Sequence, residues 1–217
     1  MKNAFVTRLL APLLATSALA AAGPAQAHPH VWVTVHAAVL YEHGAVSGVQ
    51  HDWTFDELYA AMAIEGLDAN KDGQYDRKEL AELAQVNIDG LKEFEYFTYA
   101  KLSETKLAFA APKDYWLEYA NGLLTLHFNL PLGQPVPAET PGFTFSVYDP
   151  TFFIAFDFAK DNPVTMAGAA PAGCKAALKA DDAGQDQQSL AQAFGTQMGP
   201  LGTGTAGSNT VEVTCGK

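Results

Sequence analysis

The chain has few cysteines, few basic residues and no long apolar run after its first 27 residues. It contains only two cysteines, and its 13 Lys and Arg against 24 Asp and Glu give a formal net charge of −11. Nucleic acid is therefore not expected as a partner, because its binding depends on basic residues that neutralise phosphates. Since no segment after residue 27 is apolar enough to span a bilayer, we expect the rest of the chain to be soluble and not membrane-spanning.

The motifs of several enzyme classes are also missing. The sequence has no Gly-x-Ser-x-Gly, no His-Glu-x-x-His and no phosphate-binding glycine loop. Asp56 and Glu57 have a simpler use at a helix start, and Asp149 has one in a turn before a proline. The protein is therefore predicted not to be an enzyme. A copper oxidase built on an N-terminal histidine brace, or a hydrolase, is the alternative.

The first 27 residues have the pattern of a secretory signal peptide. Lys2 and Arg8 precede an apolar run over residues 9–22, and Ala25-Gln26-Ala27 forms a small-x-small cleavage site. A membrane anchor is the alternative, which the shortness of the apolar run disfavours. We therefore expect export to the periplasm and a mature chain that begins at His28.

The two cysteines are expected to form a disulfide in that oxidising compartment. Joining Cys174 to Cys215 would close a loop of about 40 residues, which removes roughly 4 kcal/mol of unfolded-state entropy in the chain-entropy model. Two free thiols used for metal or redox chemistry are the alternative, although no Cys-x-x-Cys spacing supports them. The bond would tether a tail whose residues 180–209 are rich in Ala, Gly, Gln and Thr, with a helix expected around residues 187–194.

The segment from Asp68 to Glu79 fits a twelve-residue calcium loop at every ligand position. Short oxygen-bearing side chains stand at positions one, three and five, and Gly73 at position six permits the sharp turn. Position seven offers a backbone carbonyl, while positions nine and twelve supply carboxylates. The predicted calcium ligands are Asp68, Asn70, Asp72, Gln74, Asp76 and Glu79. An acidic turn between two helices that binds no ion is the alternative.

Helices are expected on both sides of this loop, within an insertion at about residues 54–90. Thr54 is expected as the N-cap of the first helix, and the acidic residues after it would face the positive end of the helix dipole. After the loop, Leu80, Leu83 and Val86 recur at spacings of three, which suits one buried helix face. Because the chain has only one such loop, we expect a structural clamp and not a sensor switch.

Short strands with turn signals between them make up most of residues 28–160. Apolar residues alternate from Val31 to Tyr41, and a His43-Gly44 turn would return the chain through residues 46–53. Asn121-Gly122 is a further hairpin signal. The other expected strands are residues 97–102, 106–110, 115–119, 123–130, 143–148, 152–158 and 211–215.

This pattern predicts an α+β fold in three parts. Residues 1–27 are the signal peptide, residues 28–160 form an antiparallel β-sandwich, and residues 161–217 form a disulfide-tethered C-terminal extension. The helix-loop-helix, an EF-hand-like unit, is inserted into the sandwich after its second strand.

Two groups of histidines are candidate ligands for a transition metal. Cleavage after the signal peptide would give an α-amine and an imidazole at His28 and a second imidazole at His30, donors that suit nickel, cobalt, copper or zinc. A two-residue turn after the first strand would place His36 opposite His51, with Cβ atoms about 5 Å apart. A slip of one residue would destroy that second pair. For both pairs, and for His127 on the polar face of its strand, the alternative is that no ion is bound.

Several short motifs together resemble one known family. The motifs are His28-Pro29-His30-Val31-Trp32, Trp53-Thr54-Phe55-Asp56-Glu57, the acidic loop, Leu130-Pro131-Leu132 and Tyr148-Asp149-Pro150-Thr151-Phe152-Phe153. They resemble a domain-of-unknown-function family of bacterial periplasmic proteins. Its members are labelled periplasmic components of an uncharacterised ABC-type transport system and are often encoded beside, or fused to, nickel/cobalt-type permeases. The resemblance spans residues 28 to about 158 and implies a transport accessory role with a membrane permease as partner, without supplying proven ligands.

These expectations describe a periplasmic calcium-binding accessory protein of a transport system, which handles a transition metal at its N-terminal histidines. The alternative is a calcium-stabilised protein-interaction module with no transition-metal site. A response to transition metals that is separate from the response to calcium would distinguish the two.

Overall fold

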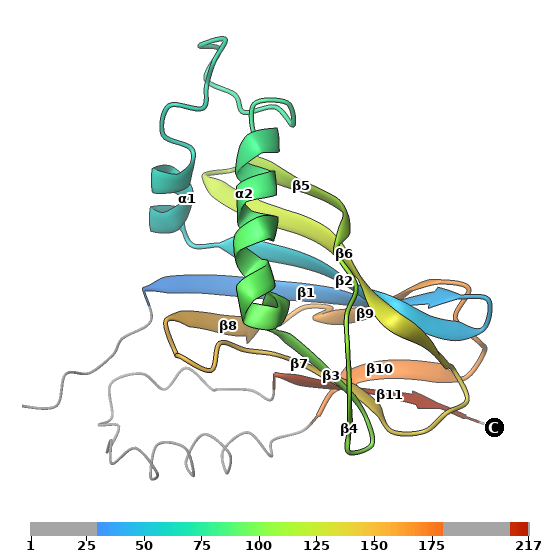
Figure 1. The fold of residues 1–217 in the computed structure, drawn as a ribbon. Coiled ribbons are helices and arrows are strands. Elements are labelled where there is room, and N and C mark those ends of the chain that lie inside the picture. Colours follow the sequence, from blue (N-terminus) through green and yellow to red (C-terminus); the bar gives the residue numbers. More distant parts are fainter. Residues whose placement is uncertain (1–29, 180–208, 217) are drawn as a thin grey trace, which may run out of the picture.

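The computed structural model describes residues 30–179 and 209–216, which form two β-sheets and a small helical unit (Figure 1). The signal peptide expected over residues 1–27, His28 and the helix expected around residues 187–194 lie outside the described residues.

The first sheet contains six strands and the second contains five. The strands of the first sheet are β1 (Val31–Glu42), β2 (Ala45–Phe55), β5 (Lys113–Ala120), β6 (Leu123–Pro137), β8 (Ile154–Phe158) and β9 (Val164–Gly168). Those of the second sheet are β3 (Thr98–Leu102), β4 (Thr105–Leu107), β7 (Phe143–Val147), β10 (Cys174–Leu178) and β11 (Thr210–Cys215). Their order is β5-β6-β2-β1-β8 in the first sheet, with β9 also paired to β1, and β10-β11-β7-β3-β4 in the second.

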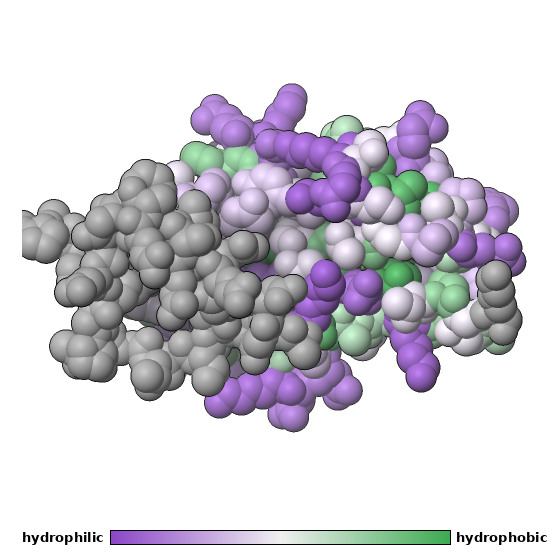
Figure 2. Space-filling model, turned by 90° about the horizontal axis from the view of Figure 1, so that it is seen from below, coloured by the Kyte–Doolittle hydropathy of each residue, from purple (hydrophilic) through white to green (hydrophobic). Residues whose placement is uncertain are grey.

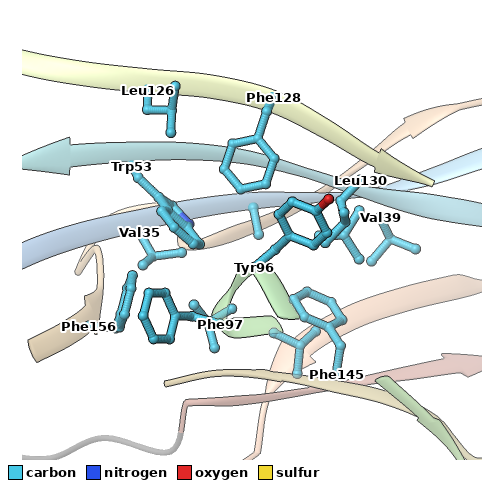
Figure 3. Close-up of a cluster of buried hydrophobic side chains, with 14 of the residues drawn as sticks. Val35, Val39, Trp53, Tyr96, Phe97, Leu126, Phe128, Leu130, Phe145 and Phe156 are labelled. Atoms are coloured by element: carbon cyan, nitrogen blue, oxygen red, sulfur yellow. The ribbon is translucent and has the colours of Figure 1, made fainter. Parts of the chain in front are cut away.

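The two sheets share one hydrophobic core. Alternation along β6 buries Leu126 and Phe128 on the inner face of the first sheet. Figure 3 shows these side chains with Trp53 of β2, close to Phe145 of the second sheet. Each fully buried large apolar side chain stabilises the fold by about 1.5–3 kcal/mol. Two sheets facing each other across one core agree with the predicted sandwich.

Both predicted hairpin turns are confirmed. His43 and Gly44 connect β1 to β2 with φ values of 51° and 76°, and Asn121 and Gly122 connect β5 to β6 with φ values of 54° and 80°. Two consecutive residues at positive φ are the geometry that matches the twist of the flanking strands, and Asn and Gly tolerate it best.

One feature of the predicted fold is wrong, because the first sheet is mixed and not purely antiparallel. β1 pairs in parallel with β8 along Val31–Val35 and with β9 along Ala37–Tyr41. The chain enters β8 after completing β7 in the second sheet, so it returns to the open edge of β1 by a crossover and not by a hairpin. A crossover of this kind permits the parallel direction.

The segment expected as a C-terminal extension, residues 161–217, contributes strands to both sheets. It supplies β9 to the first sheet and β10 and β11 to the second, and Val211 of β11 is completely buried in the common core. The predicted disulfide is confirmed: Cys174 and Cys215 are bonded and face each other in the β10–β11 ladder.

The helical unit lies between β2 and β3, as predicted. It consists of α1 (Glu57–Ala63), α2 (Ala81–Leu91) and the short 3-10 helix η1 (Lys92–Phe97). Asp56, and not Thr54, caps α1, because its carboxylate accepts a hydrogen bond from the Tyr59 amide at 2.9 Å. Figure 1 shows α2 running across the strands of the first sheet, with the α1–α2 loop at the far end of the unit. Among the described residues, no helix has the length and hydropathy to cross a membrane.

Candidate functional site

The predicted calcium loop is a curled segment between α1 and α2. Lys71 and Gly73, at positions four and six, have φ values of 62° and 77°. A left-handed conformation costs a non-glycine residue roughly 1–2 kcal/mol. A Cβ at Gly73 would meet no atom within 4 Å, so glycine is favoured there by backbone conformation and not by space.

The carboxylate of Glu79 joins the two ends of the loop. Its Oε1 accepts hydrogen bonds from the amides of Ala69 at 3.0 Å and Asn70 at 3.3 Å, and its Oε2 accepts one from Asp76 at 3.1 Å. Position twelve therefore turns back toward the start of the loop, as a closing calcium ligand must.

Asp68 at position one also turns inward. Its Oδ1 accepts a hydrogen bond from the Asp72 amide at 3.1 Å, and its Oδ2 accepts one from the Gly73 amide at 3.0 Å. Asp76 binds the amides that follow it, with Oδ1 accepting from Lys78 at 2.7 Å. These bonds hold the loop in a curl.

The donor set fits calcium better than it fits a transition metal. It consists of carboxylate, amide and carbonyl oxygens, which are the ligands that this hard cation prefers. Each carboxylate oxygen has two lone pairs, so an oxygen that accepts an amide keeps further acceptor capacity. Across residues 30–179 and 209–216, however, no group of three or more His, Cys, Asp or Glu side chains is already arranged to hold a metal. The carboxylates bind the loop's own amides instead of meeting at one point.

Two side chains attach the loop to the first sheet. Tyr75 packs edge-on against Tyr119 of β5, with ring centroids 5.0 Å apart. The guanidinium of Arg77 lies 3.5 Å from the centroid of Trp116, also in β5. Neither contact is predicted from the sequence, because positions eight and ten of the loop supply no calcium ligand.

An aromatic and charged cluster continues from Arg77 across the outer face of the first sheet. Trp116 stacks on His127 of β6 with centroids 3.9 Å apart and planes within 12°. The Nδ1 atom of His127 lies 2.6 Å from Asp52 Oδ1, and its Nε2 lies 3.5 Å from Glu118 Oε2. No hydrogen bond spans the second distance, so the buried Nε2 has no hydrogen-bond partner. We call Arg77, Trp116, His127, Asp52 and Glu118 the outer-face cluster.

The predicted pairing of His36 with His51 is wrong. β1 and β2 pair His36 with Asp52 and Ala37 with His51, because the register shifts between Leu40 and Tyr41. The shift places one additional residue in β2 next to Gly48, and a bulge of this kind moves every later pair by one position. His36 is consequently exposed on the outer face while His51 is fully buried.

The glycine beside the bulge has a steric reason. A Cβ at Gly48 would lie 2.6 Å from the carbonyl oxygen of Leu130 in β6. Only glycine permits β2 and β6 to approach this closely. The sequence offered this one hint of the irregular register.

His51 is a structural residue that connects the two sheets. The indole Nε1 of Trp53 donates to His51 Nδ1 at 3.2 Å, and His51 Nε2 lies 3.2 Å from the hydroxyl of Thr98 in β3. That hydroxyl donates in turn to the Tyr96 carbonyl at 2.8 Å. Complete burial lowers the pKa of His51 to about 3, against a smaller opposing effect of Asp52. His51 is therefore neutral at physiological pH, and both its ring nitrogens are occupied.

The N-terminal candidate site is only partly described, since His28 lies outside the described residues. His30 is exposed, and its ring packs on Phe153 at a centroid distance of 4.8 Å. Phe153 belongs to the turn before β8, where the buried Asp149 carboxylate accepts hydrogen bonds from the amides of Thr151, Phe153 and Ile154. The prediction that Asp149 is a turn residue is confirmed.

Comparison with known proteins identifies a family but no activity. Residues 13–215 match the family described as "Protein of unknown function (DUF1007)". An "Uncharacterized 15.5 kDa protein in trpE 3'region" of Spirochaeta aurantia is 37% identical over 99 residues, which are 46% of this chain and 70% of the relative. An "Uncharacterized protein" of Haemophilus influenzae is 25% identical over 138 residues, which are 64% of this chain and 66% of the relative. No solved structure matches significantly.

Proposed function

We propose that this chain, which belongs to the family described as "Protein of unknown function (DUF1007)", is a calcium-binding accessory protein of a transport system and acts in the periplasm. The observation that carries the proposal is the inward turn of Asp68 and Glu79 within the curled loop. Both side chains turn toward the interior of the loop, which is the direction that positions one and twelve of a calcium loop need, and this supports the proposal. The proposal assigns the protein no enzymatic activity.

The calcium ligands are the six residues identified from the sequence. Asp68, Asn70, Asp72, Asp76 and Glu79 would contribute side-chain oxygens, and Gln74 its backbone carbonyl. When bound, calcium supplies positive charge among four carboxylates that otherwise repel one another. It would also fix the loop residues Tyr75 and Arg77, which hold the helical unit against β5.

An extracytoplasmic location is supported by the Cys174–Cys215 disulfide, because such bonds persist mainly in oxidising compartments. The N-terminal signal-peptide pattern supports the same location and makes a membrane permease a reasonable partner. Handling of a transition metal by His28 and His30 is part of the proposal that rests on the sequence and on the family resemblance.

A second candidate function is a calcium-stabilised protein-interaction module with no transition-metal site. The packing of the His30 ring on Phe153 favours it, because that ring already takes part in an aromatic contact at the surface. Calorimetry with nickel, cobalt, copper and zinc on the mature chain distinguishes the two functions. Binding that disappears in the double variant His28→Ala/His30→Ala supports metal handling, and no binding supports the interaction module.

Thermal unfolding of the mature chain tests the calcium site. Calcium at one hundred times its dissociation constant is expected to add about 2.7 kcal/mol to the free energy of unfolding, and a chelator should remove this gain. Glu79→Gln should abolish the effect by removing the closing carboxylate. Glu65→Gln, an exposed acidic residue just before the loop, is the matched control and should retain it. An equal calcium response in the two variants would contradict the assignment.

A further inference from the structure

An apolar cavity of about 160 Å³ lies between the helical unit and the inner face of the first sheet. β1, β2 and β8 form its floor, with Trp53 and Phe156 among the lining residues. Tyr59 of α1 and Leu91 of α2 cover it, and Phe153 stands at one side. None of its lining residues belongs to the calcium loop.

The few polar atoms that line the cavity are bonded to protein. The amide Nδ2 of Asn87 donates to the Leu83 carbonyl at 2.8 Å, and the Tyr59 hydroxyl donates to Asn87 Oδ1 at 3.4 Å. A buried water needs two to four polar partners, which this lining does not offer. A cavity of about 150 Å³ with apolar walls stays dry and accepts a benzene-sized molecule. The cavity therefore has room for one ring-sized apolar group.

An exposed aromatic ring stands at the opening of the cavity. Phe153 lines the cavity and is 53% exposed, so the cavity reaches the surface beside it. An exposed aromatic ring beside an apolar pocket is typical of the anchor sites of protein interfaces. Phe153 thus offers a partner apolar contact outside the cavity itself.

The helical unit that covers the cavity is acidic. Between Asp56 and Glu95, the segment that forms the helical cover, eleven residues are acidic and four are basic. Figure 2 shows hydrophilic side chains around the margin of another face of the molecule, with hydrophobic ones between them in small groups. A partner at the cavity must therefore approach an acidic surface, which favours a positively charged one.

We propose that this cavity is a docking site for a partner protein, which inserts one apolar side chain from a positively charged peptide segment. The cavity volume sets the size of the inserted group, the exposed Phe153 ring offers the partner a contact outside the cavity, and the acidic helical cover selects the partner's charge. An anionic membrane surface is disfavoured by the same acidic cover, because like charges repel.

Benzene binding tests whether the cavity accepts an apolar group, separately from the peptide chemistry. Benzene should raise the thermal midpoint of the mature wild-type chain, because it binds the folded state only. Leu91→Phe places a larger side chain in the cavity and should remove this rise. Leu83→Phe, at another partly buried leucine of α2 that does not line the cavity, is the matched control and should keep it. No rise in the wild-type chain, or an equal rise in both variants, overturns the proposal.

A short peptide with one phenylalanine flanked by lysines tests the docking chemistry. It should bind the mature chain, and replacement of its phenylalanine by serine or of its lysines by glutamate should weaken binding about tenfold or more. Binding of the lysine peptide should also weaken as salt is added, whereas the benzene effect should not.

Surface variants keep the test valid if Leu91→Phe fails to fold. Phe153→Ala removes a half-exposed ring at the opening and should weaken peptide binding about tenfold. Phe94→Ala removes another half-exposed ring that does not line the cavity, and it should leave binding unchanged. Equal binding by the two variants, or binding to phosphatidylglycerol vesicles without binding to the peptide, overturns the proposal.

Discussion

The core around His51 and the loop between Asp68 and Glu79 satisfy their polar groups in opposite ways. His51 is completely buried, and its nitrogens are occupied by Trp53 and Thr98 on different sheets. The loop is largely exposed, and its carboxylates bind amides of the loop itself. Buried polar atoms with fixed partners specify the fold, whereas exposed polar atoms with exchangeable partners remain available for a ligand.

Acid should destabilise the core more than any single change at the loop. The pKa of His51 is about 3 in the folded chain and 6.5 in the unfolded chain. The unfolded state therefore binds more protons between these values, and stability is full above pH 6.5 and falls as pH decreases. The free energy of unfolding is expected to fall by about 1.4 kcal/mol for each pH unit below 6.5, or by about 3 kcal/mol at pH 4.

Urea unfolding at pH 7 and pH 4 measures this dependence. His51→Gln should be less stable at pH 7 and should lose this contribution to the pH slope. His36→Gln, at an exposed histidine of β1, should keep the wild-type slope. If the free energy of unfolding changed equally with pH in His51→Gln and in the wild type, protonation of His51 would not be the cause of the acid destabilisation.

Thr98→Val should lower the free energy of unfolding by about 1–3 kcal/mol. It leaves a buried ring nitrogen of His51 and the Tyr96 carbonyl without their hydrogen-bond partner. The change preserves shape, so the loss reflects hydrogen bonding more than packing. Thr34→Val, on the exposed side of β1, should change stability by less than about 0.5 kcal/mol. Equilibrium unfolding of both variants provides the comparison, and equal losses would contradict the core network.

Two glycines of the helical unit provide a matched test of loop conformation. Gly73→Ala should destabilise by about 1 kcal/mol, because φ there is 77°. Gly90→Ala, inside α2 and equally free of close neighbours, should stabilise by about 0.5–1 kcal/mol. Chemical unfolding of both variants gives the signs, and a stabilising Gly73→Ala would contradict the curled loop.

The smallest effect is expected where the loop meets the sheet. Arg77→Ala removes a cation–π contact with Trp116 that is worth about 0.5–1 kcal/mol at an exposed site. It should also alter Trp fluorescence, since the indole loses its charged neighbour. Lys78→Ala, at the next exposed cation, should do neither. Similar fluorescence spectra for Arg77→Ala and Lys78→Ala would argue against the contact between Arg77 and Trp116.

Local signals predicted the parts of the fold that local physics controls. Asn121-Gly122 identified a hairpin because few other pairs tolerate two positive φ values. Gly73 predicted a sharp turn for the same reason, and φ there is 77°. Calcium binding by the loop stays a prediction. The disulfide followed from two cysteines and an expected oxidising compartment.

The remaining features depend on contacts between distant segments. A single bulge beside Gly48 moved His36 away from His51, and the alternation of residues in β1 and β2 gives no sign of that bulge. The parallel pairing of β8 depends on the open edge of β1. The outer-face cluster draws its members from β2, β5, β6 and the loop, so it exists only when the β2–β6 and β5–β6 registers are both set.

We propose that the exposed carboxylates between Asp68 and Glu79 exchange their hydrogen bonds with backbone amides for a cation. Isothermal titration of the mature, chelator-treated chain with calcium is the decisive experiment. One calcium ion should bind per wild-type chain, and none should bind to Glu79→Gln. Absence of calcium binding in the wild type, or unchanged binding in Glu79→Gln, would contradict it.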